Sequence, residues 1–321
     1  MKAVHCTAYG KPEVLQLVDV PKPLPKADEL LVRIHATAVN SGDVRIRKAD
    51  PWAVRLIFGF SRPRNPVLGG MFSGEVIEAG IAVRAFKPGD LIFGSAGMSF
   101  GAYAEFKTMK ENAVLVQKPA SLSHLEAAII PFGALTALHF VRKANIQPGQ
   151  KVLIYGASGA VGSATVQLAK NLGAEVTAVC SGENTSLMKE LGADQVINYQ
   201  LEDLFKVKER YDVIYEAVNK LSFSESKQLL QKGGVLILGA ADFPKMLRAG
   251  FSRLSGKKIL TGVIKESTEG LSYITELIRT GKYKPVLDRS FSLDRIVEAN
   301  QYVDLGHKKG NVAIEVVPGT R

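Results

Sequence analysis

The sequence predicts an α/β protein in which a β-rich part precedes a doubly wound parallel sheet. Short apolar–polar alternations separated by Gly, Pro and Asp turns dominate the region up to residue 118. From Lys151 onward, apolar strands alternate with helices, which is typical of βαβ units and a parallel sheet covered on both faces. A glycine-rich turn, YGASGAVG at residues 155–162, joins the first strand of that region to its first helix. A chain of 321 residues also exceeds the size at which one core usually stops growing, so two domains are expected.

The composition is that of an ordinary globular protein, with 46% hydrophobic and 22% charged residues and no low-complexity tract or repeat. The N-terminus has no apolar signal segment. The longest apolar stretch, residues 127–141, is too short for a membrane span and contains Pro131 and His139. We therefore expect a soluble, cytoplasmic protein with no membrane partner. Cys6 and Cys180 stand alone, which supports neither a disulfide framework nor a cysteine-based zinc site.

The chain carries a net charge of +10, which could indicate a nucleic-acid binder, a protein that handles anionic ligands, or a solvated basic surface. Lys and Arg are scattered in runs no longer than KK, and no basic stripe is interleaved with aromatic residues that would stack on bases. A nucleic-acid partner is therefore not expected. A cofactor that carries several phosphates would gain modestly from the positive field.

Periodicity and turn residues predict the individual elements. The strands expected in the first part are residues 30–39, 73–80, 90–96 and 102–109. A long helix is expected over residues 121–144, with a serine at its start, an acidic residue early and basic residues at its end. Pro131 should break or kink this helix, because proline lacks the N–H donor and clashes with the preceding turn.

The second part predicts a parallel sheet with connecting helices. Its expected strands are residues 151–155, 175–180, 195–199, 211–218, 234–240 and 257–264. Its expected helices are residues 164–173 and 186–192. A helix at 293–303 and a strand at 311–317 follow, and periodicity alone does not assign this tail to either part.

The glycine-rich turn lies between strand and helix, which is the context that a dinucleotide fingerprint requires. It reads Ala157-x-Gly159-x-x-Gly162 in place of the strict GxGxxG, with an additional Gly156 in front. Gly159 allows the backbone to approach a pyrophosphate, Gly162 allows the helix to pack on the strand, and the helix N-terminus offers unpaired N–H groups. Glycines that serve packing alone are the alternative interpretation. The predicted dinucleotide contacts are Ala157, Ser158, Gly159, Ala160, Val161, Gly162, Ala217 and Gly239.

The end of the second strand bears on the choice between NADP and NAD. An acidic residue there would bind the ribose 2′-hydroxyl of NAD, but this sequence has Cys180. Ser181 could hydrogen-bond a 2′-phosphate, and Tyr199 closes the next strand within reach. Glu183 in the turn, with no Arg or Lys beside it, argues the other way, although a solvated turn charge is its commoner role. NADPH is therefore predicted over NADH.

Seven short motifs are spread along the chain. They are YGKPEVL (9–15), VNSGDVRIR (39–47), KPGD (87–90), GAYAEF (101–106), LTAL (135–138), GASGAVGSATVQLAK (156–170) and LGAD (191–194). Together they resemble the medium-chain dehydrogenase/reductase superfamily and, within it, the zinc-free quinone oxidoreductase-like branch. The resemblance runs over essentially the whole chain, and the last four motifs together are specific.

The resemblance implies a GroES-like β-rich catalytic domain made of residues 1–121 and 285–321. A Rossmann nucleotide-binding domain, residues 122–284, would be inserted between them, with the active site in the cleft. Relatives in this branch are often homodimers joined through the edges of the nucleotide-domain sheets, and residues 234–264 contain a suitable edge segment.

The resemblance also implies that no zinc is bound. Zinc-dependent relatives carry Cys, His and Cys where this chain has Asn40, the neighbourhood of Gly70, and the neighbourhood of Phe132, and the four-cysteine structural loop is missing. No metal is therefore predicted. Scattered structural or surface roles are expected for the five histidines, His5, His35, His124, His139 and His307.

Without zinc, this fold most simply supports hydride transfer from NADPH to a quinone or an α,β-unsaturated carbonyl. By resemblance, Asn40 and Asp43 would line the nicotinamide side of the cleft, and Thr136 would lie near the ring or substrate. Tyr103 is the nearest hydroxyl, although a buried structural tyrosine and protonation by water are expected. The alternatives are a metal-free alcohol or aldehyde oxidoreductase, and a non-enzymatic NADPH-binding protein that uses its basic surface to meet nucleic acid.

Three features depart from or add to the family pattern. Relatives often carry Asp where this chain has Met71, and many have Lys or Arg in the turn that holds Glu183. Residues 50–66 form a long, aromatic-rich segment. This segment is interpreted as a lid, a subunit contact, or a loop over a small satellite core.

Overall fold

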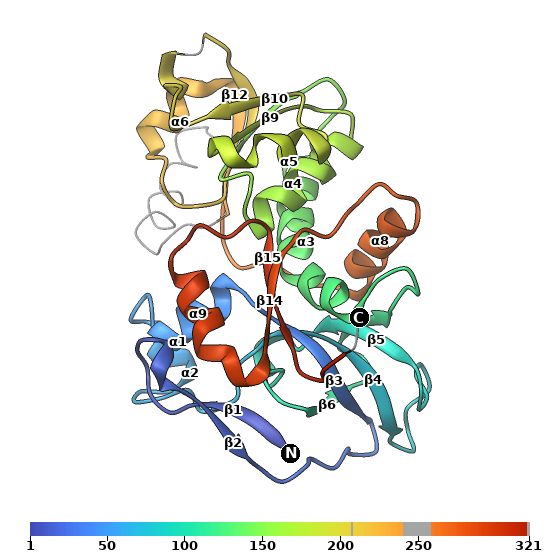
Figure 1. Ribbon diagram of the computed structural model, residues 1–321. Helices are drawn as coiled ribbons and strands as arrows, with labels where there is room; N and C mark the ends of the chain where they lie inside the picture. Colours follow the sequence, from blue (N-terminus) through green and yellow to red (C-terminus); the bar gives the residue numbers. More distant parts are fainter. Residues whose placement is uncertain (207, 240–257, 320–321) are drawn as a thin grey trace. The chain divides into compact units, whose positions relative to one another are not determined.

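The computed structural model describes residues 1–206, 208–239 and 258–319 of the chain, which divides into two compact units (Figure 1). Unit 1 comprises Met1–Phe132, Ser267–Arg279 and Pro285–Arg321. Unit 2 comprises Gly133–Glu266 and Thr280–Lys284. The two units are described separately below.

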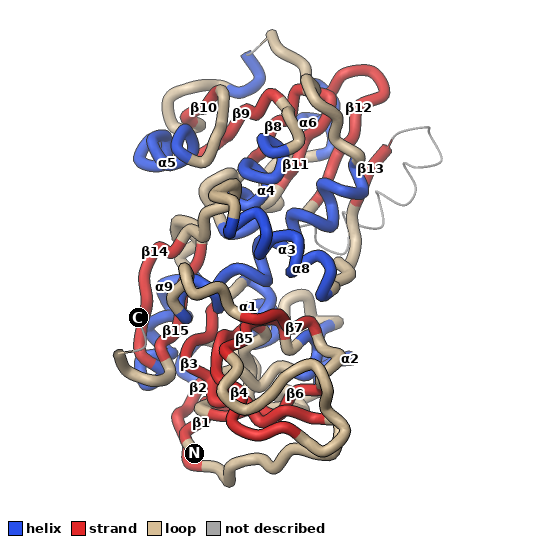
Figure 2. The backbone as a smooth tube through the Cα atoms, turned by 90° about the vertical axis from the view of Figure 1, so that its right-hand side faces the viewer, coloured by secondary structure: helices blue, strands red, loops and turns tan. Residues whose placement is uncertain are grey.

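A seven-stranded sheet forms the frame of unit 1, in the order β14-β15-β3-β4-β5-β7, with β6 paired to β3. Strands β1 and β2 form a separate antiparallel ribbon. The strands are β1 (Lys2–Cys6), β2 (Leu15–Asp19), β3 (Glu29–Val39), β4 (Met71–Ala79), β5 (Leu91–Ser95), β6 (Phe106–Lys110), β7 (Val114–Gln117), β14 (Leu287–Ser292) and β15 (Asn311–Glu315). The C-terminal β15 runs antiparallel to β3, with Val312 opposite Val39, so the last strand completes the sheet that the early strands begin (Figure 2).

The core of unit 1 lies against this sheet. Leu30, Val32 and Ile34 alternate along β3 and are fully buried, as expected for a strand whose apolar face packs inward. Ile296 and Ala299, on helix α9, belong to the same core. The helices of this unit are α1 (Ser41–Lys48), α2 (Val54–Phe58), α8 (Thr268–Arg279) and α9 (Ile296–Asp304).

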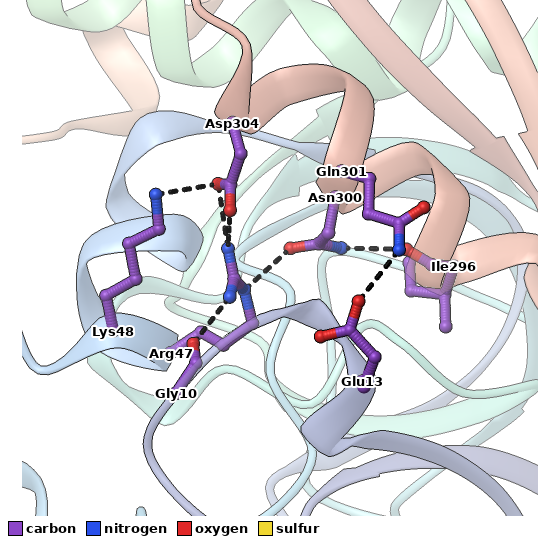
Figure 3. A network of polar contacts seen from close by, with 8 residues as sticks. All are labelled: Gly10, Glu13, Arg47, Lys48, Ile296, Asn300, Gln301 and Asp304. Atoms are coloured by element: carbon purple, nitrogen blue, oxygen red, sulfur yellow. Dashed lines mark hydrogen bonds and ion pairs between the residues drawn. The ribbon is translucent and has the colours of Figure 1, made fainter.

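A buried arginine joins α1 to α9 and to the N-terminal segment (Figure 3). The Arg47 side chain is fully buried and donates to both carboxylate oxygens of Asp304 at 2.8 Å. Its remaining donors reach Asn300 Oδ1 at 3.2 Å and the Gly10 carbonyl at 2.6 Å. Lys48 Nζ also lies 3.1 Å from Asp304. The guanidinium is therefore well satisfied in a place where an unpaired charge would be costly.

Unit 2 is built on a six-stranded parallel sheet in the order β10-β9-β8-β11-β12-β13. The strands are β8 (Lys151–Tyr155), β9 (Glu175–Cys180), β10 (Gln195–Asn198), β11 (Tyr211–Glu216), β12 (Leu230–Leu238) and β13 (Lys258–Leu260). This is the order of a doubly wound dinucleotide-binding sheet, because the first strand, β8, lies between β9 and β11 and the chain reverses direction there. The predicted fold class is confirmed.

Four helices accompany the sheet of unit 2: α3 (His124–Ala144), α4 (Ala160–Asn171), α5 (Thr185–Glu190) and α6 (Phe223–Leu229). Helix α4 contacts β8 and β9, α5 contacts β10, and α6 contacts β12. Helix α3 begins in unit 1 and continues through Pro131, so of the expected break or kink at this proline the break does not occur. By length and composition α3 could cross a membrane, but 78% of its apolar window is buried, and a core helix passes the same test.

Some element bounds differ from the sequence prediction. Helix α4 begins four residues before the predicted start, because Gly159 caps it directly after the turn. Strand β12 begins at Leu230, four residues early, because Leu230 pairs with Tyr211 of β11 ahead of a register shift. The pairing resumes at Val235, after a polar Gln-Lys-Gly-Gly stretch that apolar alternation does not mark. Strand β6 occupies only the second half of the predicted 102–109 strand. Most of the predicted edge segment 234–264 lies outside the described residues, although β13 is an edge strand of the sheet.

Candidate nucleotide-binding site

The glycine-rich turn is fixed to the neighbouring strand of unit 2. The N–H groups of Gly156 and Ala157 both donate to the Val179 carbonyl of β9, at 3.2 and 3.0 Å. Gly156 has φ +79°, in the left-handed region that glycine adopts without steric cost. A Cβ there would also lie 2.4 Å from Val218 Cγ1, so glycine is needed for both reasons.

Gly162 and Gly159 of the turn differ in whether the surrounding structure requires glycine. A Cβ on Gly162 would lie 2.2 Å from the Gly156 carbonyl oxygen and 2.7 Å from Ala157 Cα, so the helix can approach the turn only with glycine at this position. Gly159 has φ −77°, which any residue adopts, and a Cβ on it would come no closer than 3.7 Å to another protein atom. Neither packing nor backbone conformation requires glycine at 159. A side chain there would instead fill the space in front of helix α4.

This space is suited to an anion. The N–H groups of the first turn of α4, from Ala160 to Gly162, have no intrahelical acceptor because a helix leaves its first donors unpaired. The capping residue Gly159 offers no side-chain acceptor either. The positive end of the helix dipole adds to the attraction. The turn therefore has the features that hold a diphosphate: free donors, a positive end, and room left by a missing side chain.

A buried carboxylate shapes the other wall of the site. Glu216 ends β11 directly beside Tyr155 at the end of β8, which is the point where the strand order reverses. It is fully buried and accepts the N–H groups of Val218, Asn219 and Lys220, at 3.1, 2.8 and 2.9 Å. The loop after β11 is thereby fixed over the glycine turn. Sequence analysis missed this residue, although an acid that ends an otherwise apolar strand is a readable signal.

The other predicted contacts at this edge lie beside Glu216. Ala217 donates its N–H to the Tyr155 carbonyl at 3.0 Å. Gly239 donates its N–H to the Glu216 carbonyl at 2.9 Å. The structure thus brings the glycine turn, Ala217 and Gly239 to the carboxyl ends of three adjacent strands. Ligands of open α/β sheets bind outside such carboxyl ends, at the point where the strand order reverses.

The predicted 2′-phosphate contacts follow β9 and β10 at the same edge. Cys180 pairs with Asn198, so Ser181 and Tyr199 each come one residue past neighbouring strand ends. Ser181 Oγ accepts from Asn184 Nδ2 at 2.8 Å and lies 3.5 Å from a Glu183 carboxylate oxygen. Burial raises the pKa of the Cys180 thiol to about 11, so this side chain is neutral at pH 7.

A hollow of about 400 Å³ lies at this end of the sheet, lined by Tyr155 and by residues 199–205. Tyr199 is half exposed and forms one side of it. Since Tyr155 is also the last residue before the glycine turn, the hollow adjoins the predicted diphosphate position.

Two of the predicted catalytic residues, Asn40 and Asp43, form a capping box at the start of α1 in unit 1. Asn40 Oδ1 accepts the N–H groups of Gly42 and Asp43, at 2.8 and 3.1 Å, and Asp43 Oδ2 accepts the Asn40 N–H at 3.3 Å. Tyr103 is fully buried and donates its hydroxyl to Asp43 Oδ2 at 3.2 Å. Burial raises the pKa of Asp43 to about 7, against the hydrogen bonds it receives. Both residues thus hold local structure. The third predicted residue, Thr136, is nearly buried on α3 and belongs to unit 2.

The positions that carry zinc ligands in zinc-dependent relatives lie close together in unit 1. Asp43 accepts the backbone N–H groups of Gly69 and Gly70, and a Cβ on Gly42, beside Asn40, would lie 3.5 Å from the Phe132 ring. The side chains here are an amide, a hydrogen atom and an aromatic ring, which do not suit zinc. Within the described ranges, no three His, Cys, Asp or Glu residues are grouped so that they could hold a metal ion.

Two histidines that were expected to be scattered lie together in unit 1, so this expectation is wrong for them. The rings of His35 and His124 stack with centroids 4.3 Å apart, and His124 Nδ1 lies 2.8 Å from Ser73 Oγ. His35 Nε2 lies 3.8 Å from a Glu75 carboxylate oxygen. Burial, and then the neighbouring His35, lower the pKa of His124 to about 4. The sequence carries no signal for this pair, because His35 and His124 come from β3 and α3, far apart in the chain.

Comparison with known proteins places these features in context. Residues 26–120 match the protein family described as "Alcohol dehydrogenase GroES-like domain". Residues 191–314 match the family described as "Zinc-binding dehydrogenase". The chain is 32% identical over 330 residues to the 2-methylene-furan-3-one reductase of Solanum lycopersicum, which covers 99% of this chain and 80% of that protein. It is 32% identical over 350 residues to the human mitochondrial NAD(P)H oxidoreductase RTN4IP1, covering 96% and 87%. The solved structure of the quinone oxidoreductase from Coxiella burnetii is similar with a TM-score of 0.90 and 30% identity, covering 99% of each chain.

Proposed function

Because the chain belongs to the medium-chain dehydrogenase/reductase superfamily and to its quinone oxidoreductase-like branch, we propose that it is a zinc-independent, NADPH-dependent reductase of quinones or α,β-unsaturated carbonyl compounds. Its relatives at 30–32% identity include a 2-methylene-furan-3-one reductase, an NAD(P)H oxidoreductase and a quinone oxidoreductase. The observation that carries the proposal is the space at Gly159, in front of the first-turn N–H groups of α4, where a Cβ would come no closer than 3.7 Å to an atom of the described residues.

The residues of unit 2 would hold the cofactor. The first-turn N–H groups of α4 would bind the diphosphate, and Glu216 would keep the loop over the turn in place. Ser181 and Tyr199 would meet the 2′-phosphate, since the neutral Cys180 does not favour a free ribose 2′-hydroxyl as an acid would. When bound, NADPH supplies the hydride, and the conjugated acceptor needs no metal to make its carbon electrophilic.

The unit 1 residues would position the substrate side of the reaction. We assign Asn40 and Asp43 to the nicotinamide side of the site, and Thr136 to the ring or substrate. The Asp43 carboxyl accepts hydrogen bonds from nearby backbone N–H groups and from the Tyr103 hydroxyl. It therefore holds the chain around it in place. Tyr103 donates its hydroxyl to Asp43 and is fully buried, which favours water as the proton source for the product.

The test is NADPH oxidation after exhaustive chelation, with metal content measured in the same sample. Turnover of a simple quinone or enone by metal-free protein is the expected result. Tight NADPH binding with no turnover of any such acceptor would overturn the proposal and favour a binding protein, especially if RNA binds as well. Chelator-resistant turnover of simple alcohols alone would favour the alcohol oxidoreductase.

Several finer assignments stay predictions from the sequence. They are the preference for NADPH over NADH, the domain boundaries near residues 121 and 285, assembly as a homodimer, and a cytoplasmic location. The ratio of kcat/KM with NADPH to that with NADH measures the first. Sedimentation equilibrium measures the assembly.

A further inference from the structure

Five large apolar side chains of unit 1 are exposed to water within a short segment and one nearby turn. They are Trp52 (61% exposed), Leu56 (55%), Ile57 (62%), Phe60 (68%) and Met98 (68%), and together they are called the apolar patch. The Trp52 and Phe60 rings meet edge to face with centroids 6.5 Å apart. Ile57 and Met98 line the same hollow of about 260 Å³. Exposed apolar groups gathered in this way usually mark an interaction site.

The segment that carries the apolar patch, around α2 (Figure 2), is held from its inner side. Tyr9 donates its hydroxyl to the Gly59 carbonyl at 2.6 Å, and the Arg64 N–H donates to the Phe58 carbonyl at 2.6 Å. The Phe58 ring packs on Phe100 with centroids 5.6 Å apart. Phe100 belongs to the main core of unit 1 and Phe58 packs against that core, so the segment does not cover a separate satellite core. These contacts do not explain why the outward side chains of the same segment are apolar.

The surroundings of the apolar patch are basic. Between Asp43 and Glu75 the chain has one acidic residue, Asp50, and six basic ones. Arg62 and Arg64 are exposed, and no acidic side chain in the described part of the chain pairs with either of them. Arg64 also lines the hollow beside Ile57 and Met98. The patch therefore joins an apolar centre to unpaired cations.

We propose that the apolar patch attaches the protein to the surface of an anionic lipid bilayer. The aromatic and aliphatic side chains would enter the boundary between headgroups and acyl chains, where tryptophan is favoured. Arg62 and Arg64 would face the lipid phosphates, which attract basic residues close to the surface. The proposal goes beyond the reductase activity and does not depend on it.

Charge favours an anionic bilayer over a second copy of the chain as the partner of the apolar patch. An identical patch brings the same arginines, and the whole chain carries +10, so two copies would meet with like charges. An anionic bilayer complements them. The sequence-based expectation of no membrane partner rested on the lack of a spanning segment, and surface attachment requires none.

Trp52 is the only tryptophan in the chain, so tryptophan fluorescence, excited selectively over that of the nine tyrosines, reports on the patch alone. We expect vesicles of phosphatidylcholine and phosphatidylglycerol to shift its emission to the blue, and lipids with a quencher in the acyl chain to quench it. Vesicles of phosphatidylcholine alone should do far less. The protein should co-sediment with the anionic vesicles, and raising the salt concentration should release it.

Matched variants keep Trp52 as the reporter. Ile57→Ser with Phe60→Ser should weaken vesicle binding at least about tenfold, because two inserted side chains are lost. The control, Leu24→Ser with Ile81→Ser, removes side chains that are 82% and 87% exposed outside the patch and should bind as the parent does.

Charge variants follow the same design. Arg62→Gln with Arg64→Gln should weaken binding about 25-fold, at about fivefold for each arginine. Replacement of the exposed Lys11 and Lys87 by glutamine removes the same charge outside the patch and should have a much smaller effect. Circular dichroism of each variant would check that it is folded.

Three results would overturn the proposal. The first is no blue shift and no co-sedimentation at low salt, or equal losses in patch and control variants. The second is a lipid-free blue shift that grows with protein concentration alongside dimer formation, which would assign the patch to a second copy. The third is a blue shift that needs NADPH and an acceptor but no lipid, which would assign residues 50–66 to a lid.

Discussion

Replacing Gly159 and Gly162 separately by alanine distinguishes a ligand-binding turn from a turn built only for packing. At Gly162 the new methyl group would lie 2.2 Å from a carbonyl oxygen of the turn and 2.7 Å from Ala157 Cα. Both neighbours are backbone atoms, so the helix and the turn must separate. At Gly159 the new methyl group meets no protein atom within 3.4 Å, and the backbone already has a conformation open to alanine.

The magnitudes follow from these distances. Gly162→Ala should cost about 3 kcal/mol of folding free energy, the upper range for overpacking, because neither neighbour can rotate away. Gly159→Ala should change the folding free energy by less than about 1 kcal/mol, since a lower unfolded-state entropy offsets a poorer helix cap. The same methyl group would displace a diphosphate from one or two charge-assisted hydrogen bonds. That loss corresponds to about 10- to 100-fold in the dissociation constant of NADPH.

The assay measures both quantities on both variants. Thermal unfolding should show a fall of about 6 to 12 °C for Gly162→Ala and little change for Gly159→Ala. Titration with NADPH, followed by calorimetry, should show the loss of affinity in the thermally normal Gly159→Ala. If Gly159→Ala binds NADPH as tightly as the parent, the space in front of α4 does not hold the diphosphate and the assigned site is wrong.

Three further predictions concern other parts of the structure. The pKa of His124 is about 4 in the folded protein against an ordinary 6.5. Folding therefore favours the neutral ring, so the stability that His124 contributes is complete above pH 6.5 and is lost as the pH falls toward 4. His124→Gln should remove at most about 3 kcal/mol of the loss in folding free energy between pH 7 and 4. The urea concentration at the midpoint of unfolding should then change less with pH than in the parent. Arg47→Met should cost about 3 kcal/mol in urea unfolding by leaving Asp304 without its buried partner, whereas Lys48→Met should cost less than about 1. Glu183→Gln should raise the kcat/KM ratio of NADPH to NADH about fivefold, because it removes a negative charge 3.5 Å from Ser181; an unchanged ratio would place the 2′-phosphate elsewhere.

The nucleotide turn could be predicted from the sequence because its signal is local. Strand, glycine spacing and helix follow one another within some twenty residues. The structure gives Gly156 and Gly162 separate steric reasons, whereas the missing side chain of Gly159 leaves space in front of α4. The strands β8 and β9 match the predicted ranges residue for residue, since each is a short apolar run bounded by turn residues. Helix α8 was not predicted, although its buried residues Gly270, Leu271, Ile274 and Leu277 follow helical spacing.

Features that depend on contacts between distant segments could not be read in this way. Glu216 gains its role only because β11 lies beside β8, and β8 is neighbour to β9 as well. The stacking of His35 on His124 depends on where α3 starts relative to β3. Periodicity records which face of an element is buried and carries no information about which element covers it.

The hydrogen bonds of Asn40 and Asp43 give these two residues of unit 1 a structural role that the family resemblance alone does not reveal. The resemblance assigned Asn40 and Asp43 to the nicotinamide side. In the structure, the side-chain oxygens of both residues accept hydrogen bonds from the backbone of α1 and from its surroundings. A residue whose acceptors are filled by backbone donors can orient a site but cannot take a proton without breaking those bonds. By the resemblance, the position of Asn40 holds a zinc-binding cysteine in zinc-dependent relatives. A helix cap at Asn40 would keep the shape of this loop without a metal, and under the proposed function the conjugation of the substrate would supply the polarisation that a metal supplies elsewhere.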